Sequence, residues 1–257
     1  MTLTDSELER YSRQLVLPEW SGEAQERVRG SSAIVVGAGA LGSPAATYLA
    51  AAGLGRIGVV DSDDVELSNL HRQPLHYTPD IGLRKAENAA VKLRALNPEV
   101  EVDPYPARLG SDNAETIVTG ADVVVDCADS FETRYAVNDA CCALGVPLVE
   151  GAVLGLGGQV MSIVPGRTAC YRCAFPAPPS PESVPSCREA GVLGAVAGIV
   201  GSIQALEALK LLTGLGTPLV DRVLHIDAAT MEHTLIATER REDCASCSRV
   251  AASAQSG

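Results

Sequence analysis

The chain has 257 residues, of which 46% are apolar and 20% are charged, a composition typical of a globular protein with one large core or two modest ones. Its formal net charge of −12 argues against a general affinity for nucleic acid or for an anionic membrane surface. We therefore expect neither nucleic acid nor a membrane among its partners.

The first part of the chain alternates short apolar strands with helices. A helix capped by Asp5 or Ser6 is expected to run to about Leu17, where Pro18 stops it, and a second polar helix follows. Further strands are expected at 33–36, 56–61, 101–104 and 122–126, and further helices at 40–52, 82–98 and 131–144. Because helices separate successive strands, the pattern predicts a parallel, doubly wound sheet.

The pattern changes after about residue 150. Residues 157–166, "GGQVMSIVPG", alternate as an antiparallel strand does, and the proline-rich segment 174–190 is typical of a mobile surface loop. A long apolar helix is expected from Val192 to Leu212, then strands at 222–227 and 232–238. The prediction is an α/β fold. A Rossmann-like nucleotide-binding half (about 1–150) shares one sheet with an antiparallel C-terminal half (about 151–247), and a tail follows (248–257).

The sequence also indicates a cellular compartment. The N-terminal segment "MTLTDSELERYSRQL" has no apolar stretch of the kind that a signal peptide needs, and the apolar run 192–203 is shorter than the roughly 18 residues that span a bilayer. We therefore expect a cytoplasmic protein. In a reducing compartment its eight cysteines are expected to be metal ligands, core residues or catalytic thiols rather than disulfides.

A glycine motif follows the first predicted strand of the sheet. Gly37, Gly39 and Gly42 form G-x-G-x-x-G at the start of a helix, where phosphates can approach the backbone and the helix N-terminus favours their charge. Asp61 ends the next strand, where an acid commonly binds a ribose hydroxyl. The alternative is a turn that needs glycine for packing only. The motif does not distinguish NAD from another nucleotide.

Polar residues gather after the second strand of this unit. Asn69, Arg72 and Gln73 lie close together in "DVELSNLHRQPLH", and Lys85 follows a short loop. Arginine and lysine together can hold a triphosphate and stabilise charge on its bridging oxygen. The alternative is a solvated basic loop.

Two acids follow the strand expected at 122–126. Asp126 and Asp129 lie in "DCADS", and a carboxylate at this end of the sheet can hold Mg²⁺ beside phosphates. Asp126 can equally serve as a helix cap or turn residue. Asp129 is the stronger candidate because it is the last acid before the next helix.

Two CxxC pairs mark the C-terminal half: Cys170 and Cys173 in "CYRC", and Cys244 and Cys247 in "CASC". Four thiolates in two such pairs suit one tetrahedral Zn²⁺, which would clip the C-terminal segment to the body of the protein. The alternative is a pair of redox dithiols. We expect structural zinc.

Several motifs occur in a fixed order between about Arg10 and Cys247: "YSRQL", "GAGALGSP", "DSDDVELSNLHRQ", "GLRKAE", "DCADS", "CYRC", "CREAGVLG" and "CASC". As an ordered set they resemble the MoeB/ThiF family within the ubiquitin-activating-enzyme superfamily. These bacterial adenylyltransferases activate ubiquitin-like sulfur carriers. The resemblance implies a single ThiF-type domain that uses ATP and Mg²⁺, contains zinc and forms a homodimer.

The resemblance also implies roles for individual residues. Asp61 would bind the ribose, Asp129 would lie near Mg²⁺, and Arg72 and Lys85 would contact phosphates. Arg13 would reach across the homodimer interface to the triphosphate of the other subunit, although locally it is simply an exposed helix residue. The residues implied to line the ATP site are Gly37, Gly39, Gly42, Asp61, Asn69, Arg72, Gln73, Lys85 and Asp129. Cys170, Cys173, Cys244 and Cys247 would bind zinc.

Cys187 lies outside the CxxC pairs, in the proline-rich loop. It matches the family cysteine in the loop that crosses the bound carrier tail, where an accessible thiolate can attack an acyl-adenylate. Some relatives use this cysteine covalently and others release the acyl-adenylate to a separate sulfur donor, so both routes stay open. The remaining thiols, Cys127, Cys141 and Cys142, are expected to be buried packing residues.

The implied reaction joins the C-terminal Gly-Gly carboxylate of a sulfur carrier to AMP and releases pyrophosphate. Sulfur would then come from a separate protein, such as a cysteine desulfurase or a rhodanese. Carriers for molybdopterin, thiamine, cysteine, tRNA thiolation or a secondary metabolite all fit. The alternatives are adenylation of a peptide C-terminus in natural-product synthesis, an NAD-dependent oxidoreductase, and a non-catalytic scaffold clipped by zinc.

Overall fold

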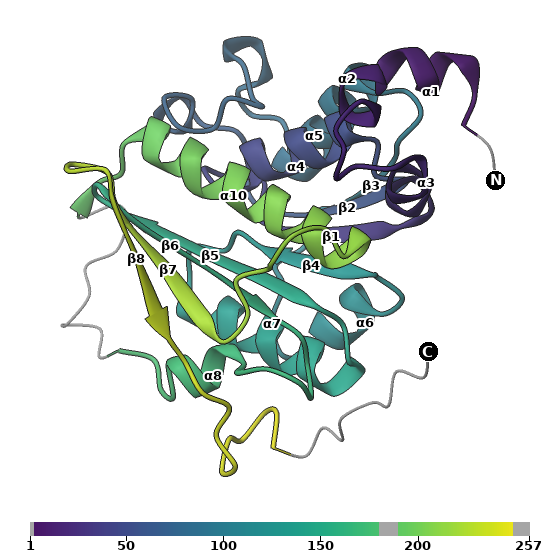
Figure 1. Ribbon diagram of the computed structural model, residues 1–257. Helices are drawn as coiled ribbons and strands as arrows, with labels where there is room; N and C mark the ends of the chain where they lie inside the picture. The colour runs from purple at the N-terminus through teal and green to yellow at the C-terminus, as the bar shows by residue number, and fades with distance from the viewer. Residues whose placement is uncertain (1–2, 180–189, 249–257) are drawn as a thin grey trace.

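The computed structural model describes residues 3–179 and 190–248, and an eight-stranded mixed sheet crosses its centre (Figure 1). The order of the strands across the sheet is β3-β2-β1-β4-β5-β6-β7-β8. The strands are β1 (Ser32–Val36), β2 (Arg56–Val60), β3 (Glu101–Tyr105), β4 (Val123–Asp126), β5 (Leu148–Leu154), β6 (Gly157–Ile163), β7 (Arg222–Asp227) and β8 (Glu232–Ala237).

The sheet changes direction at β5. Strands β3, β2, β1, β4 and β5 pair in parallel, whereas β5 to β8 pair antiparallel. The predicted continuity of a parallel Rossmann-like half with an antiparallel C-terminal half is therefore confirmed. Strand order reverses between β1 and its neighbours β2 and β4, and in such sheets ligands bind outside the carboxyl ends of the strands at this point.

Helices cover both faces of the sheet (Figure 1). Helices α3, α4, α5 and α10 pack against one face, and α6, α7 and α8 against the other, so two apolar clusters form. The helices are α1 (Asp5–Arg10), α2 (Ser12–Leu15), α3 (Gly22–Gly30), α4 (Gly42–Ala52), α5 (Lys85–Leu96), α6 (Ala114–Val118), α7 (Phe131–Leu144), α8 (Tyr171–Ala174) and α10 (Gly194–Thr213), with 3₁₀ turns at Leu67–Asn69 and Thr78–Asp80.

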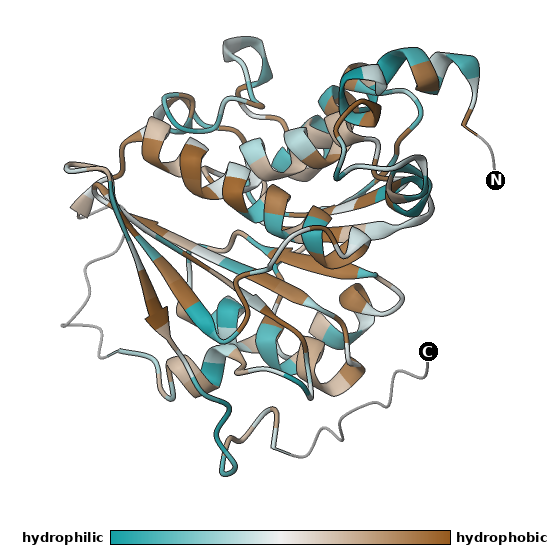
Figure 2. Ribbon diagram, in the orientation of Figure 1, coloured by the Kyte–Doolittle hydropathy of each residue, from teal (hydrophilic) through white to brown (hydrophobic). Residues whose placement is uncertain are grey.

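Close packing on the first face depends on small residues. A Cβ on Gly201 of α10 would lie 2.4 Å from the backbone oxygen of Leu41, so glycine lets α10 cross the start of α4 at close range. Helix α10 is rich in hydrophobic residues along its length (Figure 2). Among the described residues it alone is long and apolar enough to cross a bilayer, a test that the core helix of a soluble protein also passes. Its packing against α4, β5 and β6 makes it a core helix.

The N-terminal helix differs from the prediction. The expected continuous helix to Leu17 is wrong, because the chain forms α1 and α2 with a break at Tyr11, whose ring is buried. The cap is Thr4 rather than Asp5 or Ser6. The Thr4 hydroxyl accepts from the Glu7 amide, and the Glu7 carboxylate accepts from the Thr4 amide in return, which makes a capping box.

Other element boundaries shift by a few residues. The helix expected to begin at Val192 begins at Gly194, since Val192 instead forms a β-bridge with Gly155. It ends one residue later than expected, at Thr213, where Gly214 takes φ +77° as a left-handed cap. The helix at Phe131–Leu144 is confirmed with its predicted bounds. Strand β5 and helices α6 and α8 were not predicted.

Candidate active site

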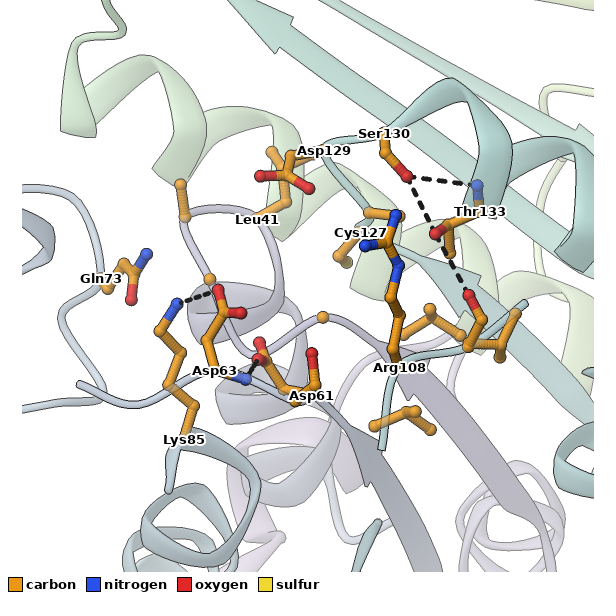
Figure 3. Close-up of a pocket in the computed structure, with 18 of the residues that line it drawn as sticks. Leu41, Asp61, Asp63, Gln73, Lys85, Arg108, Cys127, Asp129, Ser130 and Thr133 are labelled. Atoms are coloured by element: carbon orange, nitrogen blue, oxygen red, sulfur yellow. Dashed lines mark hydrogen bonds and ion pairs between the residues drawn. The ribbon is translucent and has the colours of Figure 1, made fainter. Parts of the chain in front are cut away.

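A pocket of about 320 Å³ opens at the carboxyl ends of β1, β2 and β4 (Figure 3). This volume is at the lower end of the range of small-molecule sites. The predicted residues that line it are Gly37, Gly39, Asp61, Arg72, Gln73, Lys85 and Asp129. Residues as far apart in sequence as Gly37 and Asp129 therefore meet at one pocket, at the point of the sheet where strand order reverses.

The three glycines of the motif have different surroundings. Gly37 has φ +96°, and a Cβ there would lie 2.9 Å from the backbone oxygen of Cys127. A Cβ on Gly42 would lie 1.8 Å from the oxygen of Gly37, so glycine is required for the turn itself. Gly39 has room: a Cβ there would meet only the Gln73 amide, at 3.5 Å. The packing interpretation thus accounts for Gly42, while Gly39 leaves backbone open to the pocket.

Asp61 holds the glycine loop at the pocket edge. Its carboxylate accepts from the amide of Ala38 at 2.8 Å and from the amide of Asp63 at 2.8 Å. Burial raises the pKa of Asp61, against the opposing effects of the Lys85 charge and of these hydrogen bonds. The carboxylate therefore fixes the end of β2 to the loop that follows β1.

His76 holds the same glycine loop through a hydrogen bond to the loop backbone. Its Nε2 lies 2.9 Å from the backbone oxygen of Ala38, and its Nδ1 lies 2.8 Å from the side-chain nitrogen of Asn88. Because the Asn88 amide donates to Nδ1, the imidazole carries its proton on Nε2 and donates it to Ala38. Burial lowers the pKa of His76, so the ring is neutral near pH 7. Its role as a support of the loop was not predicted.

Two predicted cations line the pocket. The Lys85 ammonium lies at the start of α5 and pairs with Asp63 at 2.9 Å (Figure 3). Its side chain is 6% exposed, whereas that of Asp63 is 67% exposed. Arg72 donates to the backbone oxygen of Ser68 at 2.8 Å, which directs its guanidinium along the 66–73 loop. Both residues line the same cavity as the glycine loop.

The two acids of "DCADS" have separate environments. Asp129 is exposed and lines the pocket (Figure 3). Asp126 is fully buried at the end of β4, where it accepts from the amide of Ala128 at 2.9 Å. Asp126 is thus the hydrogen-bonded turn residue of the alternative interpretation, and Asp129 remains the one free to meet a ligand.

Three predicted residues lie elsewhere. Gly42 packs beneath the loop, and Asn69 is buried with its side-chain oxygen accepting from the amide of Glu66, so neither lines the pocket. Arg13 belongs to α2 and also lies outside the pocket of its own chain. Cys187 falls outside the described residues.

Sequence reasoning missed several residues that line the pocket, among them Asp63, Arg108 and Arg134. Asp63 could have been found from its place two residues after Asp61. Arg108 belongs to a loop after β3 with no motif, and it pairs with Glu132 at the start of α7 at 3.0 Å. Only the tertiary fold brings that loop to the pocket.

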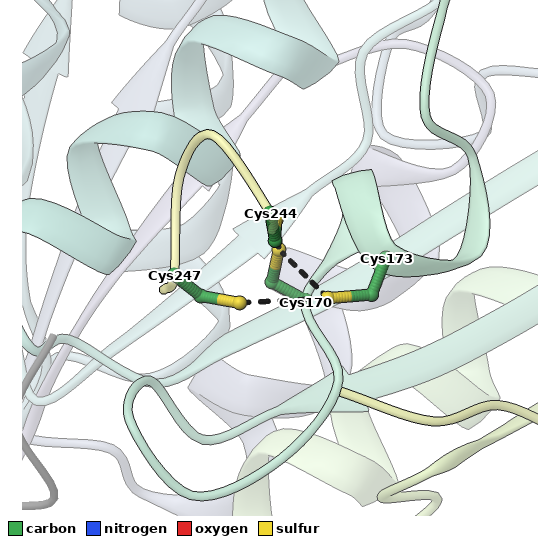
Figure 4. Close-up of side chains that lie close together, drawn as sticks. All are labelled: Cys170, Cys173, Cys244 and Cys247. Carbon is green, nitrogen blue, oxygen red and sulfur yellow. Dashed lines mark hydrogen bonds between the residues drawn. The ribbon is translucent and has the colours of Figure 1, made fainter. Parts of the chain in front are cut away.

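The four cysteines of the CxxC pairs meet below the second face of the sheet (Figure 4). All four are buried, and their sulfur atoms lie within 4.8 Å of one another. The nearest pairs are 3.4 Å (Cys173 to Cys247), 3.5 Å (Cys170 to Cys244) and 3.8 Å (Cys170 to Cys173). Zn–S bonds of 2.3 Å in a tetrahedron place the sulfurs about 3.8 Å apart, so this set fits zinc.

Helix α7 holds both CxxC turns. Asp139 accepts from Arg172, which lies between the first two cysteines, at 2.8 and 2.7 Å, and also from Ser246, which lies between the second two. Asn138 accepts from the amide of Tyr171 at 2.9 Å. The helix that begins beside the pocket therefore fixes the cysteine cluster through residues in its middle. The remaining described thiols, Cys127, Cys141 and Cys142, are buried as predicted.

The pocket has the features of an anion site with an adjacent cation site. Arg72 and Lys85 supply positive charge to its lining, and Asp129 supplies a carboxylate. Such a set can bind a polyphosphate together with a divalent cation, and it can neutralise charge that develops during phosphorus chemistry.

Comparison with known proteins shows that the chain matches one protein-family model and several characterised sequences. The ThiF family model matches residues 11–247. A sulfur carrier protein adenylyltransferase from Thermus thermophilus is 49% identical over 96% of this chain and 93% of its own length. The SAMP-activating enzyme E1 of Haloferax volcanii is 47% identical, with 96% and 91% covered.

One further relative and one solved structure extend the comparison. Adenylyltransferase and sulfurtransferase MOCS3 of Drosophila yakuba is 46% identical, and the match covers 96% of this chain and 54% of that protein. Among solved structures, E. coli MccB with ATP has a TM-score of 0.83 at 22% identity, covering 93% of this chain and 74% of that one. At this identity the likeness shows a common fold.

Proposed function

The chain belongs to the ThiF family, and from this premise we propose how it activates its substrate. It is an adenylyltransferase that uses ATP to adenylate the C-terminal carboxylate of a ubiquitin-like sulfur carrier protein. The observation that carries this function is the pocket at the carboxyl ends of β1, β2 and β4, where the glycine loop, Arg72, Lys85 and Asp129 meet in a chain 49% identical to a sulfur carrier protein adenylyltransferase.

In the proposed reaction the carrier's terminal Gly-Gly carboxylate attacks the α-phosphorus of ATP. A carboxyl oxygen of the carrier forms a bond to the α-phosphorus. The bond between the α-phosphorus and the oxygen that bridges it to the β-phosphorus breaks, and pyrophosphate leaves. No general base is needed, because a C-terminal carboxylate is ionised at neutral pH. Arg72 and Lys85 would neutralise charge on the phosphates, and Asp61 would bind the ribose. The backbone at Gly39 would approach the triphosphate.

The donor sets support two metals. Asp129 would hold Mg²⁺, which supplies charge neutralisation beside the phosphates when it is bound. The four buried thiols would hold Zn²⁺, whose part is structural because all four positions of a tetrahedron would be filled by cysteine. The zinc would fix the C-terminal segment against α7 and β6.

We further propose a homodimer. An apolar groove runs over α4, α5 and α10 and is lined by Pro44, Tyr48, Leu96, Ile199 and Ile203. Tyr48 is 56% exposed and Leu96 is 42% exposed, which favours burial against a second copy of this chain. Arg13 lies outside its own pocket, so it is available to enter the pocket of the partner subunit.

The remaining parts of the pathway follow from the same proposal. We place nucleotide binding in residues of about 1–150, carrier binding in about 151–247, and a tail after them, all within one ThiF-type domain. A separate cysteine desulfurase or rhodanese would supply sulfur, and the reaction would take place in the cytoplasm. Cys187 would either capture the acyl group or leave the acyl-adenylate to that donor.

The test is carrier-dependent exchange of labelled pyrophosphate into ATP. The probe is a purified small ubiquitin-like protein whose sequence ends in Gly-Gly, and intact mass is expected to show an AMP adduct on it. A matched carrier lacking its last glycine is the control and should give no adduct. Binding of NAD instead of ATP, or adduct formation only on a short peptide, would overturn the assignment of substrate.

A further inference from the structure

A buried ionic cluster lies at the inner wall of the pocket, where its arginine is one of the lining residues. Arg134 of α7, Asp126 of β4 and Glu150 of β5 are 8%, 0% and 1% exposed. Neither acid lines the pocket, and the proposed reaction uses none of the three groups. Charged groups at this depth are costly unless they are paired, so their retention calls for an explanation.

The cluster forms hydrogen bonds to the backbone of Ala128, the residue immediately before Asp129. Arg134 donates from Nε and Nη2 to the backbone oxygen of Ala128, at 3.1 and 2.9 Å, while the amide of Ala128 donates to Asp126 at 2.9 Å. Both polar groups of residue 128 are therefore held by buried side chains. The next residue, Asp129, projects its carboxylate into the pocket (Figure 3).

The charges of the cluster do not balance if both acids are ionised. Asp126 and Glu150 are register partners on neighbouring parallel strands, and Arg134 reaches Glu150 at 3.2 Å. One oxygen of each carboxyl group, Oδ2 of Asp126 and Oε2 of Glu150, is buried without a hydrogen-bond partner. A single proton on the pair would provide a donor and leave one negative charge opposite one arginine.

Among the described residues, the other groups that face the cluster supply no second positive charge. Gln159 of β6 and the Tyr171 hydroxyl of α8 face the cluster as neutral groups, and Gln204 of α10 donates to the backbone oxygen of Asp126 at 2.6 Å. The balance therefore rests on the three ionisable side chains themselves.

We propose that Arg134 is a positioning residue for Asp129, and that Asp126 and Glu150 hold it in place as an acid pair carrying one proton and one negative charge. The first part rests on the proposed binding of Mg²⁺ at Asp129; the second part stands independently of the reaction. Burial, only partly offset by Arg134, raises the pKa of Asp126 to about 6 and that of Glu150 to about 7, in agreement with this charge state.

The charge state is tested by thermal unfolding of Asp126→Asn, Glu150→Gln and the double variant. Each single change keeps one carboxylate for Arg134, so each should lower Tm by less than about 3 °C. The double change leaves Arg134 unpaired and should lower Tm by about 10 °C or more, beyond the sum of the singles. Adding Arg134→Met to the double variant should restore most of the loss, which also covers the case in which the double variant fails to fold. If the two single changes lower Tm additively, or if adding Arg134→Met does not restore Tm, the two acids do not share one proton.

Positioning is tested by titrating ATP into Arg134→Lys with and without Mg²⁺. Lysine cannot make two bonds to Ala128 and a third to Glu150, so affinity in excess Mg²⁺ should fall about tenfold. In a chelator the affinity should change less than twofold, because Asp129 acts only through the ion. An equal loss in both conditions, or no loss, refutes the positioning role.

Two further variants separate the possible failures. Asp129→Asn should remove the effect of Mg²⁺ on ATP affinity. If it does not, the proposed ion site is wrong. If it does and Arg134→Lys behaves as the wild type, the positioning inference alone fails. Leu144→Gln, an exposed change at the C-terminal end of the same helix, is the control and should alter ATP affinity less than twofold.

Discussion

Replacing Lys85 by methionine separates catalysis from stability. The Lys85 ammonium pairs with Asp63 at 2.9 Å, and its partner is 67% exposed. An ion pair with so exposed a member contributes about 1 kcal/mol at most, and methionine preserves much of the buried stem. The Tm is therefore expected to fall by no more than about 4 °C.

The same change should have a far larger effect on the reaction. Removing one preorganised charge from a transition state in a confined site typically costs about 100- to 1000-fold in rate, or about 3–4 kcal/mol. Carrier-dependent pyrophosphate exchange should fall by that factor while the protein remains folded. The effect on the barrier thus exceeds the effect on stability at least threefold.

Arg84→Met provides a matched control for this experiment. Arg84 precedes Lys85 and pairs with Asp64 at 3.3 Å, but it lies outside the pocket. Its loss should change exchange less than about threefold. Exchange by Lys85→Met within threefold of the wild type, or an equal loss in both variants, would refute the placement of Lys85 at the phosphates.

Three other predictions concern the metal, the glycine loop and pH. Purified protein should contain one zinc ion per chain, as measured by atomic absorption. The Cys247→Ala variant should lose this ion and unfold at least about 10 °C lower. A wild-type protein that keeps its Tm after the metal is removed would contradict this. Gly42→Ala should destabilise the fold and abolish ATP binding, because its Cβ would lie 1.8 Å from the backbone oxygen of Gly37. Gly39→Ala should fold normally and only weaken ATP binding. Tm and ATP titration measure the two effects. His76 has a lowered pKa, so the unfolded state takes up its proton first, and the stability that neutral His76 contributes is lost as pH falls below about 6.5. Tm measured from pH 7.5 to 5 should therefore fall more steeply in the wild type than in His76→Gln, and parallel curves would exclude this role.

Much of the fold follows from local pattern. Strand and helix periods along the first 150 residues predict the parallel half, and the alternation of 157–166 predicts β6. Strand β5 was missed because Glu150 and Gly151 interrupt its apolar residues while both faces are buried at its start, so it has no period-two signal. The break at Tyr11 was missed because it depends on a distant contact: the Tyr11 hydroxyl accepts from the side chain of Asn97.

Some residues of the candidate site can likewise be predicted from local sequence, and others cannot. Glycine spacing, the acid after β2 and the CxxC pairs are local signals whose chemistry can be predicted from residue type and distance along the chain. Asn69 shows the limit of that reasoning. Its neighbours Arg72 and Gln73 reach the pocket, yet Asn69 is turned inward to cap a 3₁₀ turn, because its amide satisfies a backbone group there.

The sequence by itself determined the family, the parallel-to-antiparallel sheet and part of the set of charged groups that line the pocket, because each depends on residue type and spacing. The tertiary structure alone decided which of those groups share one cavity. It also decided that Asp126 is buried away from that cavity beside Glu150 and Arg134. The physical reason is that burial and charge pairing arise between strands and helices distant in sequence, and no local pattern encodes them.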